Sequence, residues 1–457
     1  MRRLVVVSNR VGPVRAAAKA AGGLAVALVD ALRERGGLWF GWSGKVGERF
    51  SSRIEKVEEG PLTLLTMDLS QEDFDAYYNG FANQTLWPLF HYRVDLSQFD
   101  RAHFEGYNRV NARFAQALLP RLEPDDLIWV HDYHFIPFAS QLRSMGCEQR
   151  MGYFLHIPFP APEILVTLPV HDSLVRALFS YDLVGFQTEP DRIAFINYCV
   201  QETGGRIIDD YHVEAFGRTI QVRAFPIGID TENFAELAAS AGAKDRCVRM
   251  SDVLHGQIQI IGVDRLDYTK GLPERFRAFE RLLENYPENR GGVTLMQIAP
   301  TSRTDVEDYV DIRNELEGIS GNVNGRFGEF DWTPIRYIGR SFGRKALAGL
   351  YRASKVGLVT PLRDGMNLVA KEYVAAQDPE NPGALVLSRF AGAARQLDSA
   401  VIVNPFDTEG VAEALQRSLR MPRPERLDRW HSMMGCLRRE NVDKWRNDFL
   451  AALRGRE

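Results

Sequence analysis

Short, almost continuously apolar runs alternate with helical patterns along the whole chain, and this alternation limits the fold more than any other feature. The apolar runs are Leu4–Ser8, Leu127–His131, Tyr153–His156, Leu183–Gln187, Ile258–Val263, Thr294–Ala299, Val356–Thr360, Leu385–Ser388 and Val401–Asn404. Such runs suit strands that are buried on both faces of a parallel sheet. The helical patterns between them include Leu24–Arg33, Pro273–Tyr286, Lys345–Ala353 and Leu368–Gln377. The sequence therefore predicts an α/β protein with doubly wound parallel sheets.

At 457 residues the chain is too long for one ordinary core, so we expect two or three domains. The strands fall into two groups, with the Ala-rich helix Phe234–Ala243 between them. We predict an N-terminal domain over 1–235 and a second domain over 236–457. The amphipathic helical tail 425–457 belongs to the second domain and packs on the rest of the chain. Each domain has its ligand crevice at the carboxyl ends of its strands, so the active site is the cleft between the domains if those edges face each other.

The composition excludes several classes of partner. The net charge is −4 and no block of basic residues stands out, which argues against nucleic acid and against an anionic membrane. No apolar stretch approaches the roughly 20 residues that span a bilayer, and the N-terminal apolar run is too short for a signal sequence. Cys147, Cys199, Cys247 and Cys436 are irregularly spaced, which is typical of reduced thiols. We therefore expect a cytoplasmic protein.

Polar and charged side chains gather where the predicted strands end. They are Arg10, Asp132, His156, Arg265, Lys270, Arg303, Asp364 and Glu372. One such residue is weak evidence, since loops are polar in any protein. Six strand ends with such residues, all placed to point into one crevice, form a stronger pattern and indicate a functional site.

The first strand–helix junction is the segment Asp264–Pro273. Arg265 and Lys270 lie beside the N-terminus of a helix, where unsatisfied N–H groups and the helix dipole favour a diphosphate. The alternative interpretation is a solvated loop in which the two cations pair with Asp264 and Asp267.

The second junction is the segment Pro361–Glu372. Its helix start supplies further N–H donors, Asp364 could accept hydrogen bonds from sugar hydroxyls, and Glu372 could hold both hydroxyls of a ribose. The alternative interpretation of Glu372 is an ion pair with a neighbouring Lys or Arg on the helix surface.

Motifs for other chemistries are lacking. The spacing of His131 and His134 fits no zinc motif, so we predict no metal site. Gly44-Lys45 lacks the remainder of a phosphate-binding loop, and neither a dinucleotide fingerprint nor a serine nucleophile elbow occurs. His156 precedes the rigid turn Ile157–Pro160, where it could be structural or functional.

Longer motifs carry a resemblance to a known family. They are Val5–Arg10, Ala21–Ala25, Gly37–Gly44, Leu86–Pro88, Trp129–His134, Phe154–Pro160, Asp264–Gly271, Ile298–Arg303 and Thr360–Asp378. At these residues, and over essentially its whole length, the chain resembles the trehalose-6-phosphate synthases. These are retaining glycosyltransferases with the two-domain GT-B fold.

The resemblance implies an activity and a role for each matching residue. The activity is transfer of glucose from UDP-glucose to glucose 6-phosphate without a metal ion or other cofactor, by a homo-oligomer. The residues implied in donor binding are Gly22, Gly23, His156, Arg265, Lys270, Phe342, Asp364, Met366, Asn367, Leu368, Val369 and Glu372. Those implied in acceptor binding are Arg10, Trp42, Tyr78, Trp87, Asp132 and Arg303. Those implied in catalysis are Asp132, His156, Arg265 and Lys270.

The chain departs from the family pattern at Arg395-Gln396, where we expect a pair containing Asn or Glu. This departure leaves open a related transferase with another nucleotide or another phosphorylated acceptor. A regulatory relative that only binds sugar phosphate is the alternative from a different class. The role of Asp132 also stays open, because it could orient the acceptor or take part in proton transfer.

Overall fold

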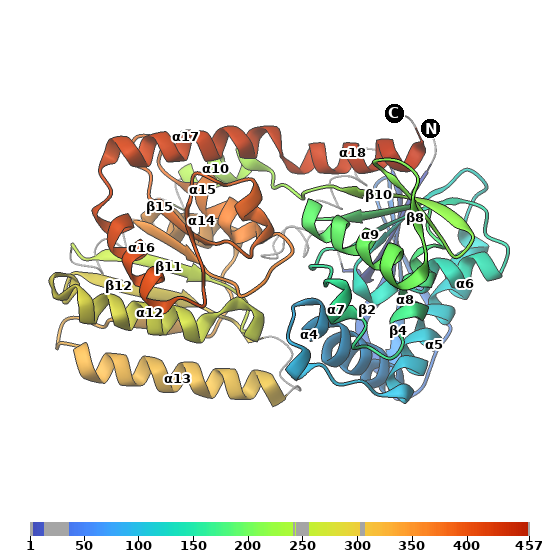
Figure 1. Ribbon diagram of the computed structural model, residues 1–457, viewed down its shortest axis with the longest axis horizontal. Coiled ribbons are helices and arrows are strands. Elements are labelled where there is room, and N and C mark those ends of the chain that lie inside the picture. Colours follow the sequence, from blue (N-terminus) through green and yellow to red (C-terminus); the bar gives the residue numbers. More distant parts are fainter. Residues whose placement is uncertain (1–2, 13–35, 241–242, 244–255, 302–306, 456–457) are drawn as a thin grey trace. The chain divides into compact units, whose positions relative to one another are not determined.

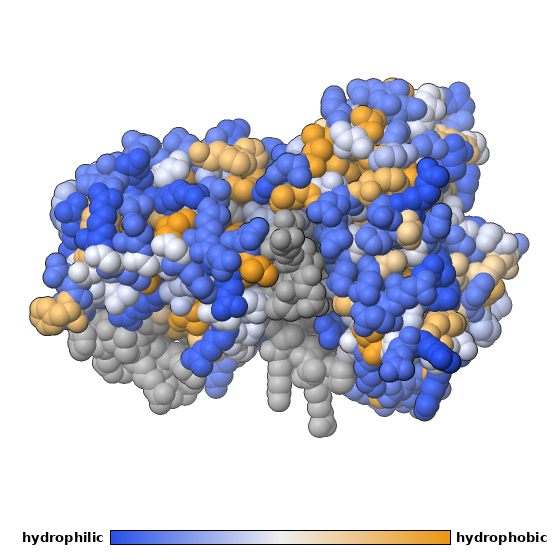
Figure 2. All heavy atoms as spheres, turned by 90° about the horizontal axis from the view of Figure 1, so that it is seen from below, coloured by the Kyte–Doolittle hydropathy of each residue, from blue (hydrophilic) through white to orange (hydrophobic). Residues whose placement is uncertain are grey.

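The computed structural model describes residues 3–12, 36–240, 243, 256–301 and 307–455. The chain forms two compact units, and each is described by itself. Unit 1 contains the described residues up to Pro226 and those from Trp445 onward, and unit 2 contains Ile227–Lys444. On the face drawn in Figure 2, hydrophilic side chains predominate and apolar ones lie singly or in small groups, because most large apolar side chains are buried in the cores.

Unit 1 is built on a ten-stranded sheet with the order β3-β4-β2-β1-β5-β6-β7-β10-β9-β8. Its strands are β1 (Leu4–Arg10), β2 (Gly37–Gly47), β3 (Ile54–Glu59), β4 (Leu62–Ser70), β5 (Leu127–His131), β6 (Arg150–Phe154), β7 (Leu183–Phe186), β8 (Arg206–Ile207), β9 (His212–Ala215) and β10 (Arg218–Ala224). The run from β4 to β10 is parallel, and antiparallel strands close the sheet at both edges. The carboxyl ends of β1, β2 and β5 therefore meet at one edge of the sheet.

Helices cover the sheet of unit 1 (Figure 1). They are α3 (Gln71–Asp73), the π-helix η1 (Phe74–Leu86), α4 (Trp87–Phe90), α5 (Arg101–Leu118), α6 (Phe138–Ser144), α7 (Pro162–Leu165), α8 (His171–Leu178), α9 (Glu189–Thr203) and α18 (Val442–Arg454). Local chemistry sets several ends. The Asp100 carboxylate accepts the N–H of Ala102 at 2.6 Å and caps α5, and α9 ends at Gly204, where φ is 66°, as helix caps commonly do.

Unit 2 is a six-stranded, fully parallel sheet with the order β13-β12-β11-β14-β15-β16. Its strands are β11 (Ile258–Val263), β12 (Val293–Ile298), β13 (Ile335–Ile338), β14 (Val356–Val359), β15 (Ala384–Ser388) and β16 (Val401–Val403). Its helices are α10 (Thr231–Ala239), α12 (Leu272–Asn285), α13 (Glu307–Phe327), α14 (Arg344–Ala353), α15 (Leu368–Ala376), α16 (Thr408–Arg420) and α17 (Arg423–Arg439). Helices α12, α13 and α16 pack together, and α10, α14, α15 and α17 form the second group (Figure 1). The strand order reverses between β11 and β14, so this pair of strand ends is the switch point at which doubly wound sheets bind ligands.

The helical tail divides between the two units. Helix α17 packs in unit 2, where the Trp430 indole N–H donates to the Val374 carbonyl at 3.0 Å. Helix α18 belongs to unit 1 and lies on its sheet, because Phe449 stacks on Trp129 with the ring centroids 4.6 Å apart. A Cβ atom at Gly152 would lie 2.9 Å from the Phe449 ring, so the absence of a side chain there lets the helix approach the strand.

The predicted fold class is confirmed, and every apolar run named above forms a strand. The contacts divide the chain differently from the prediction in two respects. The boundary falls between Pro226 and Ile227 rather than near residue 235, and residues 445–455 join the first unit rather than the second. The predicted helix Leu24–Arg33 lies outside the described residues. In the described parts of the chain, no helix is both long enough and apolar enough to cross a membrane.

Candidate active site

Arg10 stands at the carboxyl end of β1, and its guanidinium lies against the next strand. Its Cζ atom is 5.6 Å from the ring centroid of Trp42 on β2. A Cβ atom at Gly44 would lie 2.7 Å from an Arg10 nitrogen, so the bare backbone of Gly44 makes room for the guanidinium. Arg10 itself is exposed, which leaves its N–H groups accessible to an anion.

A chain of aromatic rings continues from Trp42. Tyr78 on η1 lies 5.5 Å from Trp42 and stacks on His134, and Tyr133 joins His134 to Trp87. The Trp42 indole N–H donates to the Lys45 carbonyl at 2.7 Å, which fixes the ring. The structure thus brings together the predicted residues Arg10, Trp42, Tyr78 and Trp87 beside one edge of the sheet.

Asp132 follows β5 in a backbone conformation that side chains rarely adopt, with φ 76° and ψ 167°. A non-glycine residue in this region costs on the order of 1–3 kcal/mol and is held by its surroundings. Its backbone N–H donates to the Phe154 carbonyl at 2.8 Å, and its carboxylate accepts the backbone N–H of His156 at 3.3 Å. Asp132 and His156, which the sequence places on different strands, are therefore neighbours.

His156 lies two residues beyond β6, and its imidazole contacts that of His131. From the sequence, His131 was considered only as a metal ligand, and this contact was not predicted. The Nδ1 atom of His131 is 3.0 Å from the Nε2 atom of His156. Burial lowers the pKa of His156 to about 3, so its ring is neutral at physiological pH. The only signal for His131 in the sequence is its position before Asp132, where a buried strand ends.

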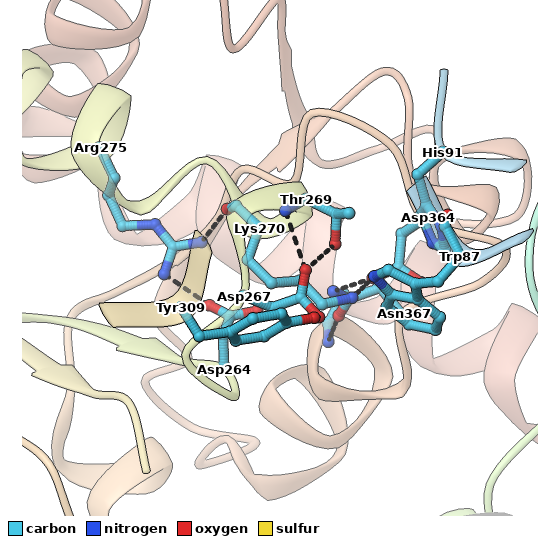
Figure 3. A network of polar contacts seen from close by, with 11 residues as sticks. Trp87, His91, Asp264, Asp267, Thr269, Lys270, Arg275, Tyr309, Asp364 and Asn367 are labelled. Carbon is cyan, nitrogen blue, oxygen red and sulfur yellow. Dashed lines mark hydrogen bonds and ion pairs between the residues drawn. The ribbon is translucent and has the colours of Figure 1, made fainter. Parts of the chain in front are cut away.

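In unit 2 the loop between β11 and α12 carries Arg265, Lys270 and Gly271. Gly271 has φ 63°, and a Cβ atom there would lie 2.4 Å from the Thr360 carbonyl oxygen, so glycine is required. This close approach joins the loop to the end of β14. The Lys270 ammonium reaches Asp364 across it at 2.6 Å (Figure 3). Arg265 is exposed on the same loop.

A network of buried polar side chains connects this loop to α12 and to the end of β14 (Figure 3). Arg275 on α12 forms an ion pair with Asp264 at 2.6 Å and donates to Thr360 at 3.0 Å. Burial raises the pKa of Asp264, while Arg275 and then Lys270 oppose that rise. The Asp267 carboxylate accepts the N–H of Thr269 at 3.0 Å. The alternative interpretation given above pairs the two cations of this loop with Asp264 and Asp267. In the structure, Lys270 instead forms its ion pair with Asp364.

The junction between β14 and α15 carries other residues that the sequence analysis assigned to donor binding. Asn367, with φ 77°, accepts the N–H of Ala370 at 3.1 Å and donates to Asp364 at 3.1 Å. Met366 is buried, with its carbonyl accepting the N–H of Ala393 at 2.7 Å. Leu368 and Val369 open α15, and N–H groups in a first helical turn have no partner within the helix. This turn offers backbone donors beside Asp364.

Glu372 and Lys371 lie one turn further along α15. Burial raises the pKa of Glu372 to about 7, and Arg344 partly offsets this effect. Among the described residues Glu372 makes no ion pair, so the surface ion pair considered above does not form there. Lys371 is buried and donates to Gln396 at 2.6 Å and to the Ile227 carbonyl at 2.5 Å. Gln396, one of the two departures from the family pattern, thus contacts the donor-side helix.

The remaining predicted site residues are Phe342, Gly22, Gly23 and Arg303. Phe342 precedes α14 and is half-buried, with the Arg340 guanidinium 5.0 Å from its ring centroid. Gly22, Gly23 and Arg303 lie outside the described residues. In the described ranges, no group of three or more His, Cys, Asp or Glu side chains is arranged to hold a metal ion.

The chain is similar to known proteins over nearly its whole length. Residues 5–455 match the profile of glycosyltransferase family 20. A trehalose-6-phosphate synthase of Enterobacter sp. (strain 638) is 50% identical over 454 residues, which cover 99% of this chain and 95% of that protein. The crystal structure of a UDP-forming alpha,alpha-trehalose-phosphate synthase from Burkholderia xenovorans in complex with glucose-6-phosphate has 57% identity and a TM-score of 0.96, and the match covers 99% of this chain and 100% of that one. An E. coli trehalose-6-phosphate protein bound with UDP-2-fluoro glucose has 50% identity and a TM-score of 0.95, with coverage of 99% and 98%.

Proposed function

The chain belongs to glycosyltransferase family 20, and from that premise we propose how its residues divide the work of the reaction. It is a UDP-forming alpha,alpha-trehalose-phosphate synthase, which transfers glucose from UDP-glucose to glucose 6-phosphate and releases UDP. The observation that carries this conclusion is the full-length match at about half identity.

Unit 2 holds the donor. Arg265, Lys270 and the N-terminus of α15 stabilise the diphosphate, because cations and helix N–H groups favour the charge that grows as UDP leaves. Asp364 accepts from hydroxyls of the transferred glucose, and Glu372 accepts from the ribose. Support comes from the Lys270–Asp364 contact at 2.6 Å, which places the phosphate-binding cation and the sugar-binding carboxylate side by side. Phe342 lies toward the uracil, and Met366 and Asn367 shape the turn.

Unit 1 holds the acceptor. Arg10 and Tyr78 bind the phosphate of glucose 6-phosphate, since a guanidinium offers charge-assisted hydrogen bonds to phosphate oxygens. The family resemblance also assigns Arg303, which lies outside the described residues, to this phosphate. Trp42, Trp87 and Asp132 line the sugar. The exposed guanidinium of Arg10 beside the Trp42 ring supports this assignment. Gly22 and Gly23, which lie outside the described residues as well, are assigned to the donor by the same resemblance.

The chemistry follows from the groups that are present. The bond between the glucose C1 atom and the UDP oxygen breaks, and a bond from C1 to the acceptor oxygen forms on the same face. The leaving phosphate oxygen takes the acceptor's proton, so configuration is retained without a carboxylate nucleophile. Asp132 orients the acceptor. Arg265 and Lys270 supply the positive charge that a metal ion provides in other transferases, so we propose a reaction without a metal. We also propose a cytoplasmic homo-oligomer, which the family resemblance supports and sedimentation velocity would test.

An assay of UDP release over a panel of acceptors tests the proposal. The panel contains glucose 6-phosphate, glucose, fructose 6-phosphate and glycerol 3-phosphate, and each acceptor is tested with UDP-glucose and with ADP-glucose. We expect UDP-glucose with glucose 6-phosphate to give the fastest release, far above the reaction without acceptor. Faster release with another acceptor or nucleotide, or release that no acceptor accelerates, would contradict the proposal.

A further inference from the structure

The two imidazoles of His131 and His156 form a pair at the edge of the unit 1 sheet. His131 is the last residue of β5 and is fully buried. Its Nδ1 atom is 3.0 Å from the Nε2 atom of His156, and the two rings are stacked with an interplanar angle of 27°. This is hydrogen-bond distance, so one nitrogen donates and the other accepts.

Both rings are neutral, so each carries one N–H proton and a single proton lies between the two facing nitrogens. Burial lowers the pKa of His131 well below its ordinary value, and nearby His156 lowers it further. Burial alone lowers the pKa of His156 to about 3. Two arrangements are then available. In the first, His131 donates from Nδ1 to Nε2 of His156, and His156 carries its own proton on Nδ1. In the second, His156 donates from Nε2 to Nδ1 of His131, and the Nδ1 atom of His156 is unprotonated.

The surroundings of His131 distinguish these arrangements. Its ring lies among aromatic rings, with centroids 4.6 Å from Trp129 and 6.4 Å from Trp445. Its Nε2 atom is buried and has no hydrogen-bond partner among the described residues. An indole supplies an N–H donor and no acceptor, and buried N–H groups without an acceptor are rarer than unused lone pairs. The Nε2 atom of His131 is therefore the unprotonated nitrogen, and its proton is on Nδ1.

We propose that His131 is a positioning residue that fixes the proton of His156 on Nδ1, so that His156 presents an N–H donor to a hydroxyl of the transferred glucose. The contact between His156 and glucose rests on the proposed function. The direction of the hydrogen bond between the two histidines does not.

The Nδ1 atom of His156 faces the side-chain amide of Gln187. The Gln187 Nε2 atom lies 3.5 Å from it, the outer limit of a hydrogen bond. An amide nitrogen only donates, so a proton on Nδ1 of His156 requires the Gln187 amide to be flipped, with its oxygen toward the ring. The 3.0 Å contact with His131 is the shorter of the two contacts and holds the ring in place.

Two substitutions of one residue separate the hydrogen bond from the packing. His131→Asn keeps an amide N–H close to the position of Nδ1, and His131→Phe keeps the ring and loses the donor. Trp445→Phe is the control, because it replaces a larger ring by a smaller one in the aromatic cluster that contains His131. The Trp445 indole nitrogen has no hydrogen-bond partner among the described residues, so this change removes packing without removing a hydrogen bond. Steady-state rates with UDP-glucose and glucose 6-phosphate are measured for each variant. The tautomer of His156 is read from long-range ¹H–¹⁵N spectra of protein labelled at histidine.

We expect the wild-type spectra to show His156 protonated on Nδ1. His131→Phe should lower kcat by about tenfold or more, the direction seen when a histidine loses the partner that sets its tautomer. Its KM for UDP-glucose should change less than kcat. His131→Asn and Trp445→Phe should stay within about threefold of wild type, as expected when the donor is kept.

The spectra also separate this inference from the proposed function. A His156 protonated on Nε2 in the wild type would overturn the inference even if the Phe variant failed to fold. An equal fall in kcat for His131→Phe and Trp445→Phe would mean that packing, not the hydrogen bond, causes the fall, and would also overturn the inference. The same holds for an equal fall in kcat for His131→Phe and His131→Asn. Unchanged turnover in His156→Ala would instead overturn the glucose contact assigned under the proposed function.

Discussion

The Lys270 ammonium lies 2.6 Å from an Asp364 carboxylate oxygen, although the two residues come from different strand–helix junctions of unit 2. Both side chains are largely buried, with exposed fractions of 11% and 14%. A buried pair of this kind is costly to break from one side, because the remaining charge loses its partner. The pair therefore holds a cation and a carboxylate at fixed positions beside the first turn of α15, which is what an ordered diphosphate sugar requires.

Removal of the Lys270 charge should slow the chemical step. Lys270→Ala should cost at least about 2 kcal/mol of transition-state stabilisation, the scale of one preorganised electrostatic contact. Most of the loss should fall in kcat, since charge grows on the diphosphate as the bond breaks. Arg277→Ala, which removes a half-exposed cation from the same helix region, should leave both constants near wild type. A change confined to the KM for UDP-glucose would indicate ground-state binding only.

Activity should persist in excess chelator. Arg265 and Lys270 provide fixed positive charge at the diphosphate, so a divalent cation has no role to fill. The measurement is the initial rate of UDP release with EDTA, followed by addition of magnesium or manganese. Complete loss of the rate with EDTA, restored by either ion, would contradict this account.

Arg10→Ala should weaken the use of glucose 6-phosphate selectively. A charge-assisted hydrogen bond contributes roughly 1.5–3 kcal/mol, so kcat/KM for this acceptor should fall roughly 10- to 150-fold. Hydrolysis of UDP-glucose without acceptor should stay unchanged. Arg206→Ala, which removes an exposed arginine of the same unit, should affect neither rate. A parallel fall in both rates for Arg10→Ala would mean that the residue does not bind the acceptor phosphate.

Glu372 should make stability depend on pH. Burial raises its pKa to about 7, above the ordinary 4.5, so between these values the folded chain holds a proton that the unfolded chain has released. The stabilisation linked to this proton is full below about pH 4.5 and is lost as the pH rises through about 7. Glu372→Gln should therefore gain stability relative to wild type as the pH is raised, measured by denaturant unfolding.

The same substitution should impair donor binding. A neutral amide accepts hydrogen bonds from a ribose less strongly than a carboxylate does, so the KM for UDP-glucose should rise in Glu372→Gln. Glu315→Gln, on the exposed face of α13, is the control for the change in charge. The pH dependence predicted above has its own contradicting outcome. If the stability difference between Glu372→Gln and wild type stays constant from pH 5 to pH 8, Glu372 does not titrate in this range.

The sequence predicted the parts of the fold that depend on buried apolar runs. The strands β1 and β5 of unit 1 and β11 and β14 of unit 2 follow from such runs, and within each sheet parallel pairing brings the polar strand ends to one edge of that sheet. The sequence patterns did not predict β2 (Gly37–Gly47), because its glycines and the polar residues Ser43 and Lys45 interrupt the apolar run. The division of the tail also went unpredicted, since helical periodicity in α17 and α18 shows an apolar face without showing which sheet it covers.

The site was predicted as a set of residue types rather than as a set of contacts. Lys270 and Asp364 were both expected at strand ends, but their pairing depends on the close approach that Gly271 allows. His131 was missed as a partner of His156, because 25 residues separate them and only the register between β5 and β6 brings them together. Contacts of this kind come from strand pairing, which local patterns do not contain.

The placement of α18 also bears on how the chain is synthesised. The ribosome completes unit 2 before it makes residues 445–455, yet Phe449 and Trp445 pack against Trp129 in unit 1. Unit 1 emerges first but is completed only after unit 2, and until residues 445–455 have been made it exposes the apolar surface that α18 covers. Loss of residues 445–455 would therefore damage the unit that was made first, next to the paired histidines, rather than the unit that precedes them in the sequence.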